Sequence, residues 1–175
     1  MARCILFVLL FLYLPLWADN GRQCVLYFAL GEVGVTEATG HNDGEVEKYL
    51  RYVGLKKGDP YCAAYCSWVY AQECLPNPRS GWSPSWFPQD KVVYEKGREE
   101  NTVVQQGDVF GIYFKDKGRI AHVGMIIDMN NQWVTTVEAN TSPDKNEGEA
   151  TREGDGVFKK KRLKSQIYKV ANWID

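Results

Sequence analysis

One cysteine of the chain lies where the start of a helix could turn its thiol into a nucleophile. Cys62 follows Asp59 and Pro60 by three and two residues. Asp is a favoured N-cap residue and Pro a favoured first helical residue, so the pattern predicts a helix capped by Asp59, with Cys62 in its first turn. The partial positive charge at a helix start lowers the pKa of a thiol. Cys62 is therefore the candidate nucleophile, and a small core residue is the alternative.

Only two histidines are available as a base for this thiol. His41 lies in the segment 36–44, which is rich in turn-forming residues, and we expect it to act as a turn or capping residue. His122 lies early in the apolar segment 118–127, whose pattern is typical of a strand. A polar ring inside such a strand needs a hydrogen-bond partner. We predict that His122 is the base that accepts the proton of Cys62.

The next predicted strand carries two polar residues that could orient the imidazole. Glu138 and Asn140 are two residues apart, so in a strand both side chains lie on one face. They stand about 6.5–7 Å apart along that face, so only one can hydrogen-bond the ring directly. We expect Glu138 to do so, because a carboxylate stabilises an imidazolium more strongly than an amide does. Asn140 would then lie near the substrate or the oxyanion.

Other catalytic chemistries find less support in the chain. The two histidines are far apart and form no zinc-binding pair, so we expect no metal and no cofactor. The segment 81–85 ends in Ser where the elbow of a serine hydrolase needs Gly. Cys66 is expected in the core, one helical turn after Cys62. Cys24 and Cys74 could form a disulfide, but the pairing stays open.

Hydrophobic periodicity predicts the elements that position these residues. An apolar helix covers 25–35 up to its glycines, and a second helix covers 45–53. The segment 75–88, with four prolines, is an irregular loop whose Trp82, Trp86 and Phe87 either line a groove or pack the loop down. The predicted strands are 108–114, 120–129, 133–140, 156–162 and 168–174. Helices followed by antiparallel strands predict an α+β domain with its helices on one side of the sheet.

Length, composition and charge narrow the class of protein. The chain has 175 residues, 45% hydrophobic and 13% aromatic, which suits one domain with a packed core. A formal net charge of -1 gives no electrostatic argument for nucleic-acid binding. Residues 1–18 have the pattern of a secretory signal peptide, with Arg3 before an apolar run too short to span a bilayer. We expect cleavage after Ala18, and an uncleaved membrane anchor is the alternative.

Five segments together resemble one known family. They are 40–50, Asp59–Val69, Gln106–Phe110, Ala121–Met125 and Val137–Thr141. They resemble, in order and over most of 30–173, the CHAP family of papain-like amidases and peptidases that act on peptidoglycan, a group related to NlpC-type enzymes. The resemblance implies a papain-like fold over 19–175, with N-terminal helices packed on an antiparallel β-sheet. Tyr61 departs from the family's usual Trp but keeps an aromatic ring.

The resemblance also implies a set of roles and partners. It implies Cys62 as nucleophile, His122 as base, and Glu138 with Asn140 as orienting residues. The implied activity is that of a cysteine hydrolase, secreted or periplasmic, that cleaves a peptidoglycan amide bond as an N-acetylmuramoyl-L-alanine amidase or a peptide endopeptidase. The alternatives are an NlpC-type stem-peptide endopeptidase and a catalytically silent wall-binding module. We expect a monomer that binds peptidoglycan, binds no nucleic acid, and meets a membrane only through an uncleaved leader.

Two details complete these expectations. Some CHAP members carry an acidic calcium loop before the cysteine, but no Asp-x-Asp pattern precedes Cys62, so calcium is not expected. The basic run Lys159–Lys164 is expected to be a solvated strand edge, where Lys discourages further pairing. Contact of this run with the anionic cell wall is the alternative.

The leader generates the first testable prediction. Expressed in a bacterial host with residues 1–18 present, the protein should reach the periplasm or medium about 2 kDa smaller, because a signal of this kind is removed on export. N-terminal sequencing should find Asp19 at or near the start of the exported chain. Finding Met1 or Ala2 on the exported protein would instead support a membrane anchor.

Overall fold

The computed structural model describes residues 16–73, 75–98, 103–143 and 154–175, with side chains from residue 21 onward. The predicted leader lies outside the described residues except for 16–18, which form the start of the first helix, so it stays a prediction. Cys74, one half of the disulfide considered above, also lies outside them. Within the described ranges, no helix is both long enough and apolar enough to cross a membrane.

The helices come first in the chain, as the periodicity predicts. They are α1 (Leu16–Gly31), α2 (Glu47–Tyr52) and α3 (Cys62–Ala71), followed later by the short 3-10 helices η1 (Ser83–Trp86) and η2 (Lys164–Gln166). Helix α2 ends just before Gly54, which has a φ of 78°, a conformation that glycine adopts without strain. All three predicted helices are present; α1 begins earlier than predicted and ends at Gly31, one of the two glycines at which its end was expected.

The rest of the domain is an open six-stranded antiparallel sheet. Its strands are β1 (Val92–Glu95), β2 (Val109–Phe114), β3 (Arg119–Met129), β4 (Trp133–Thr141), β5 (Gly156–Leu163) and β6 (Lys169–Ala171), in the spatial order β1-β6-β2-β3-β4-β5. All five predicted strands are present, and β6 is shorter than predicted. Strand β1 was missed, because its four residues are too few to show an alternation, and it gains its structure by pairing with β6 at the sheet edge.

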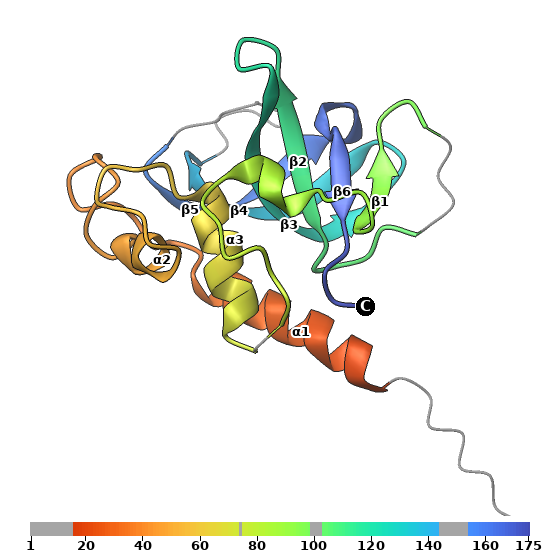
Figure 1. The fold of residues 1–175 in the computed structure, drawn as a ribbon, viewed down its shortest axis with the longest axis horizontal. Coiled ribbons are helices and arrows are strands. Elements are labelled where there is room, and N and C mark those ends of the chain that lie inside the picture. Colours follow the sequence, from red (N-terminus) through yellow and green to blue (C-terminus); the bar gives the residue numbers. More distant parts are fainter. Residues whose placement is uncertain (1–15, 74, 99–102, 144–153) are drawn as a thin grey trace, which may run out of the picture.

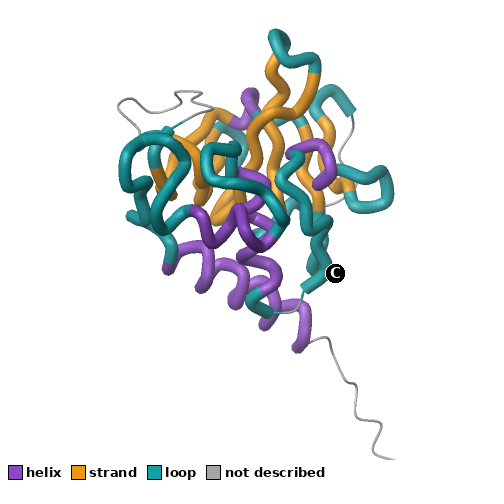
Figure 2. Tube along the Cα trace, turned by 60° about the vertical axis from the view of Figure 1, so that its left-hand side comes forward, coloured by secondary structure: helices purple, strands orange, loops and turns teal. Residues whose placement is uncertain are grey.

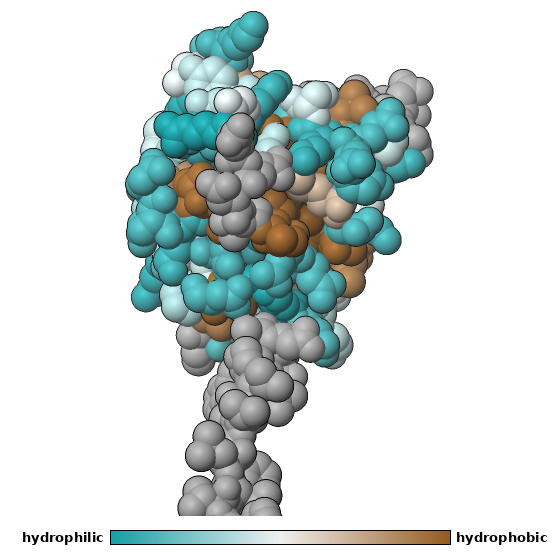
Figure 3. Space-filling view, turned by 90° about the vertical axis from the view of Figure 1, so that its right-hand side faces the viewer, coloured by the Kyte–Doolittle hydropathy of each residue, from teal (hydrophilic) through white to brown (hydrophobic). Residues whose placement is uncertain are grey.

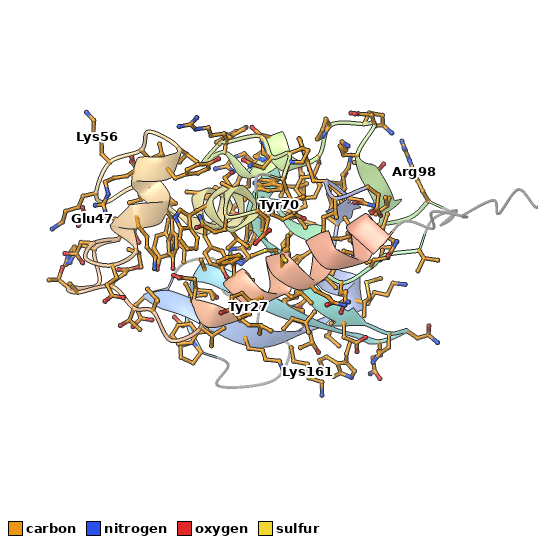
Figure 4. The ribbon with its side chains drawn as sticks, turned by 90° about the horizontal axis from the view of Figure 1, so that it is seen from below. Tyr27, Glu47, Lys56, Tyr70, Arg98 and Lys161 are labelled. Atoms are coloured by element: carbon orange, nitrogen blue, oxygen red, sulfur yellow. The ribbon has the colours of Figure 1, made fainter. Side chains whose placement is uncertain are left out.

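The helices lie on one side of the sheet, which confirms the predicted α+β arrangement (Figures 1 and 2). Helix α3 packs on β3 and β4, and α1 packs on α3. The main core joins buried residues of α3 such as Val69 to strand residues such as Val123 and Val137. Figure 4, seen from below, shows α1 lying across this layer, and Tyr70 of α3 is wholly buried in it. Helix α3 is therefore fixed between the sheet and α1.

The aromatic residues of the loop between α3 and β1 were expected either to line a groove or to pack the loop down, and the structure shows both. Trp86 is wholly buried and packs edge-on against Tyr70 and Trp173. Phe87 lies over Gly111, where an added Cβ would come within 2.6 Å of the Phe87 ring. These two residues pack the loop down. Trp82 is 52% exposed and lines a cavity.

The start of α3 differs from the prediction in one respect. Tyr61, not Asp59, occupies the N-cap position, and Cys62 is the first helical residue rather than the third. The Asp59 carboxylate instead accepts a hydrogen bond from the backbone N–H of Lys56, at 2.8 Å, which closes the preceding turn. The predicted cap is therefore wrong, because Asp59 caps a local turn before the chain reaches the helix. Cys62 still lies at the positive end of α3.

The outer surface is mostly hydrophilic on the side that Figure 3 shows, which is the right-hand side of Figure 1. Hydrophobic residues are most concentrated near the middle of this face, and smaller groups of them appear elsewhere on it. Most of the remaining visible face is hydrophilic, as expected for a domain with a packed apolar core.

A buried arginine ties α1 to the sheet and to the end of the chain. Nη1 of Arg22 donates to the Asp108 carboxylate and to the Gln106 carbonyl oxygen, both at 2.9 Å. Nη2 of Arg22 is paired with Asp175. The side chains of Arg22 and Asp108 are almost completely buried. Removal of the chain up to Ala18 would leave Arg22, and with it this attachment of α1, in place.

Arg22→Met should lower the free energy of unfolding by about 3–5 kcal/mol, because it leaves the buried Asp108 carboxylate without its partner. Urea denaturation followed by circular dichroism measures this loss. The matched control is Arg51→Met, which removes an exposed guanidinium paired with Glu47 and should change stability by no more than about 1 kcal/mol. Equal effects in the two variants would contradict the anchoring role of Arg22.

Candidate active site

Cys62 lies where α3 begins and where the protein surface is hollowed. Its side chain is 6% exposed and forms part of the wall of a cavity of about 520 Å³. Burial acts to raise the pKa of the thiol, but the neighbouring His122, together with Ser83 and the backbone of Val123, outweighs burial and lowers it. The neighbours of Cys62 therefore make its thiolate more accessible than that of an ordinary cysteine, although the side chain is nearly enclosed by protein.

His122 of β3 links the thiol to the sheet. The imidazole is wholly buried, and its Nε2 lies 2.7 Å from Oε2 of Glu138. The other ring nitrogen, Nδ1, has no hydrogen-bond partner among the described residues, and the neighbouring thiol of Cys62 acts on the pKa of the ring. Burial opposes protonation of the ring, but Cys62 and Glu138 outweigh it and raise the pKa of His122 to about 9. The imidazolium is therefore stable at neutral pH.

Glu138 of β4 is held as an anion although it has no exposed surface. Arg162 donates to it from Nε, at 2.8 Å, and from Nη2, at 2.5 Å. The hydroxyl of Thr136 donates to Oε1 at 2.5 Å. Burial acts to raise the pKa of Glu138, but Arg162 and then His122 hold it well below its usual range. The hydrogen bond expected between Glu138 and the imidazole is present, while its role in catalysis stays a prediction.

The contribution of Arg162 was not predicted from the sequence. The run 159–164 was expected to be a solvated strand edge, and β5 is indeed an edge strand. However, Lys160 and Arg162 are buried, so the prediction is wrong for these two residues. Alternate residues of β5 lie on the same face, and Arg162 uses that face to neutralise Glu138. A carboxylate predicted inside an apolar strand needs a cation, and this need was the signal that could have identified it.

A glycine makes room for the carboxylate. A Cβ added to Gly124 would lie 2.8 Å from Cγ of Glu138 and 2.8 Å from the carbonyl oxygen of Val137. Gly124 is two residues after His122 on the same strand, so the absence of its side chain lets Glu138 approach the imidazole. An isolated glycine inside a strand often marks such a close approach. This role of Gly124 was not predicted from the sequence.

The side chain of Asn140 forms its hydrogen bonds with the backbone rather than with the imidazole. Its Oδ1 accepts a hydrogen bond of 2.7 Å from the backbone N–H of Tyr61, and its Nδ2 lies 3.4 Å from the carbonyl oxygen of Gly154. Asn140 has a φ of 56°, in the left-handed region that asparagine tolerates better than most residues. Asn140 thus binds the backbone of Tyr61, the residue that precedes Cys62, and this hydrogen bond fixes the start of α3.

The remaining candidates fall outside the reactive set. His41 is exposed in its turn and contacts Thr39, as expected. Cys66 is wholly buried one turn along α3, and burial, followed by the charges of Cys62 and Glu138, raises the pKa of its thiol well above the usual value. Cys24, Cys62 and Cys66 are free thiols. In the part of the chain with described side chains, no group of His, Cys, Asp and Glu residues could hold a metal ion.

Ser83 is a second residue of the site that the sequence analysis missed. It is buried in η1, and its Oγ lies 3.7 Å from the thiol sulfur of Cys62. The surrounding segment was considered only as a possible serine-nucleophile motif. A hydroxyl next to a thiolate can donate a hydrogen bond to the sulfur, and Ser83 contributes in this way to the lowered pKa of Cys62. Together these residues place a buried thiol and a buried imidazole beside a cavity, with neighbours that favour the thiolate and the imidazolium, an arrangement suited to attack on a carbonyl carbon.

Comparisons with known proteins give no relative of this chain. A scan against protein-family models, a search of curated proteins and a search of solved structures each find no match. The resemblance to the CHAP family therefore rests on the motifs in the sequence alone.

The geometry predicts different pH responses for the two polar residues of β4. Glu138→Gln removes the charge that helps to raise the pKa of His122 to about 9, so the imidazolium is lost at lower pH and the apparent pKa of Cys62 rises. Asn140→Ala should lower turnover without moving that pKa. The rate of alkylation of Cys62 by iodoacetamide, measured against pH, reports both variants. A shift in Asn140→Ala but not in Glu138→Gln would reverse the two assignments.

Proposed function

We propose that this chain is a cysteine-dependent amidohydrolase or peptidase with a papain-like fold, which hydrolyses an amide bond in peptidoglycan. The observation that carries the catalytic part is the buried set Cys62, His122 and Glu138, in which neighbouring groups favour the thiolate, the imidazolium and the carboxylate. Perturbed groups of this kind beside a cavity are typical of catalytic sites. The peptidoglycan substrate is supported by the resemblance of the motifs to the CHAP family.

Each residue of the set has a role in the proposed reaction. The thiolate of Cys62 attacks the carbonyl carbon of the amide, and the backbone N–H groups at the start of α3 stabilise the resulting oxyanion. Protonated His122 gives its Nδ1 proton to the leaving amine, and a thioester with Cys62 remains. His122 then takes a proton from water, which attacks the thioester, releases the carboxylic acid and restores the thiol pair. Glu138 holds the Nε2 proton throughout and keeps the ring oriented.

Three activities share this chemistry or this substrate. The first two, an N-acetylmuramoyl-L-alanine amidase and a peptide endopeptidase, including one of the NlpC type, use the same nucleophile and differ in the bond that they cleave. The third, a catalytically silent wall-binding module, would gain nothing from a buried pair of charges at a cavity wall. The polarised thiol therefore favours an enzyme. Its proposed setting is the periplasm or the exterior of the cell, as a monomer without a metal or other cofactor.

The proposal is tested by turnover of purified sacculi. Cys62→Ala should abolish the release of soluble fragments, whereas Cys66→Ala should remain folded and active, because Cys66 is kept as a thiol by burial. His122→Ala should be as severe as Cys62→Ala, since residues that act as one unit give non-additive losses. Mass spectrometry of the fragments identifies the bond that is cleaved.

His41→Ala is the matched control for His122→Ala and should remain nearly fully active, because His41 is exposed in a turn where its ring contacts Thr39. Equal loss of activity in the Cys62 and Cys66 variants, with both correctly folded, would overturn the assignment of the nucleophile. Release of fragments by Cys62→Ala would overturn the proposed mechanism.

A further inference from the structure

The cavity beside Cys62 carries two arginines that the proposed reaction does not use. Arg79 comes from the loop after α3, and Arg119 is the first residue of β3. Both line the same cavity wall as the thiol of Cys62. Neither guanidinium has a carboxylate partner among the residues with described side chains. Two guanidinium groups thus line the cavity that leads to Cys62, and neither forms an ion pair with a described carboxylate.

Arg119 is held in place by an aromatic ring and by the backbone. Its guanidinium carbon lies 3.9 Å from the centroid of the Trp82 ring, which is a close cation–π contact. Its Nη1 donates to the carbonyl oxygen of Ile120 at 2.9 Å. An arginine has five N–H donors, so most donors of Arg119 remain available for a ligand. The ring and the carbonyl oxygen therefore orient the guanidinium before any ligand binds.

Arg79 is also oriented by an aromatic ring and a backbone carbonyl oxygen, both of Tyr52. Its guanidinium carbon lies 5.0 Å from the centroid of the Tyr52 ring, and its Nε donates to the Tyr52 carbonyl oxygen at 3.2 Å. The backbone of Arg79 has a φ of 45°, an uncommon conformation for a residue with a side chain. Strained backbone of this kind tends to occur at functional sites. The uncommon backbone conformation is thus at Arg79 itself, whose side chain lines the cavity.

The remaining lining residues decide which ligand the arginines can bind. Among the described residues that line the cavity, Asp59 is the single acidic one, so the wall carries two guanidinium groups and one carboxylate. Its Oδ2 already accepts the N–H of Lys56. Val53, Leu55 and the exposed face of Trp82 add apolar surface. The wall therefore suits a ligand that has a carboxylate and an apolar or planar portion, because guanidinium groups bind carboxylates with paired hydrogen bonds.

We infer that this cavity is a substrate subsite in which Arg79 and Arg119 bind a free carboxylate of the peptide whose amide bond Cys62 attacks. The inference rests on the proposed function, because it takes Cys62 as the nucleophile. It narrows the substrate to peptides with an anionic group near the scissile bond. A peptide in which that carboxylate is converted to an amide loses the charge and is hydrolysed more slowly.

The test compares two reagents of similar size that alkylate Cys62, the anion iodoacetate and the neutral iodoacetamide. The measured quantity is the ratio of their rate constants, because this ratio cancels changes in the fraction of thiolate. Alkylation at Cys62 is identified by peptide mass mapping. Arg79→Gln and Arg119→Gln should each lower the ratio about threefold to tenfold, as expected for the loss of one ion pair at a partly exposed site. Higher salt should lower the wild-type ratio as well.

The matched control is Arg98→Gln, which removes an arginine paired with Glu95 on the exposed surface. Figure 4 shows Arg98 at the opposite end of the molecule from Lys56, the residue that follows the cavity residue Leu55. The ratio should stay unchanged in this variant, and Arg119→Lys should retain part of the preference because it keeps the charge. A ratio that is unchanged in either cavity variant, or that falls equally in Arg98→Gln, overturns the two-arginine site.

Failure of this inference can be told apart from failure of the proposed function. Alkylation depends only on the reactivity of Cys62 and the charge of the cavity, so it needs no turnover. If sacculi are not hydrolysed but the ratio falls as expected, the proposed function fails and the anion site stands. If sacculi are hydrolysed and the ratio does not change, the enzyme stands and the anion site is wrong.

Discussion

A carboxylate with no exposed surface lies at the centre of this structure, and its charge has to be balanced. Burial alone would protonate Glu138, but the guanidinium of Arg162 and the imidazole of His122 bind its two oxygens and keep it ionised. The fixed anion then favours the protonated form of His122, and protonated His122 favours the thiolate of Cys62. A chain of alternating charges thus runs from β5 through β4 and β3 to the first residue of α3.

Features of the surrounding backbone hold the charged side chains of this chain in position. Gly124 leaves the space through which Glu138 reaches the imidazole. Asn140 binds the backbone of Tyr61 and so attaches the start of α3 to β4. The sheet thereby positions the thiol and the imidazole relative to each other, although the two residues are far apart in sequence. The cavity that exposes Cys62 is built from the end of α2, the loop after α3 and the start of β3.

The sequence predicted the helices and strands that show a clear hydrophobic periodicity, and it predicted a hydrogen-bond partner where a single polar residue lies in an apolar strand. The strand of His122 and the helix that follows Tyr61 could be recognised from their patterns, and a polar ring in an apolar strand called for a partner such as Glu138. The buried position of Arg162 could not be read from a run of basic residues, because such a run also suits a solvated edge. The predicted N-cap of α3 was wrong because the Asp59 carboxylate accepts a hydrogen bond from the backbone N–H of Lys56 in the preceding turn. The cavity arginines escaped notice because only the folded chain brings them to Cys62.

The central claim is that His122 is an imidazolium at neutral pH, paired with the thiolate of Cys62 and held by Glu138. The most direct measurement is a pH titration of the ring nitrogens of His122 by nitrogen-15 NMR, with His41 replaced by Gln so that a single histidine is observed. The account predicts a doubly protonated ring through neutral pH that loses its proton near pH 9. A ring that is already neutral at pH 7, close to the ordinary histidine pKa of about 6.5, would contradict the account.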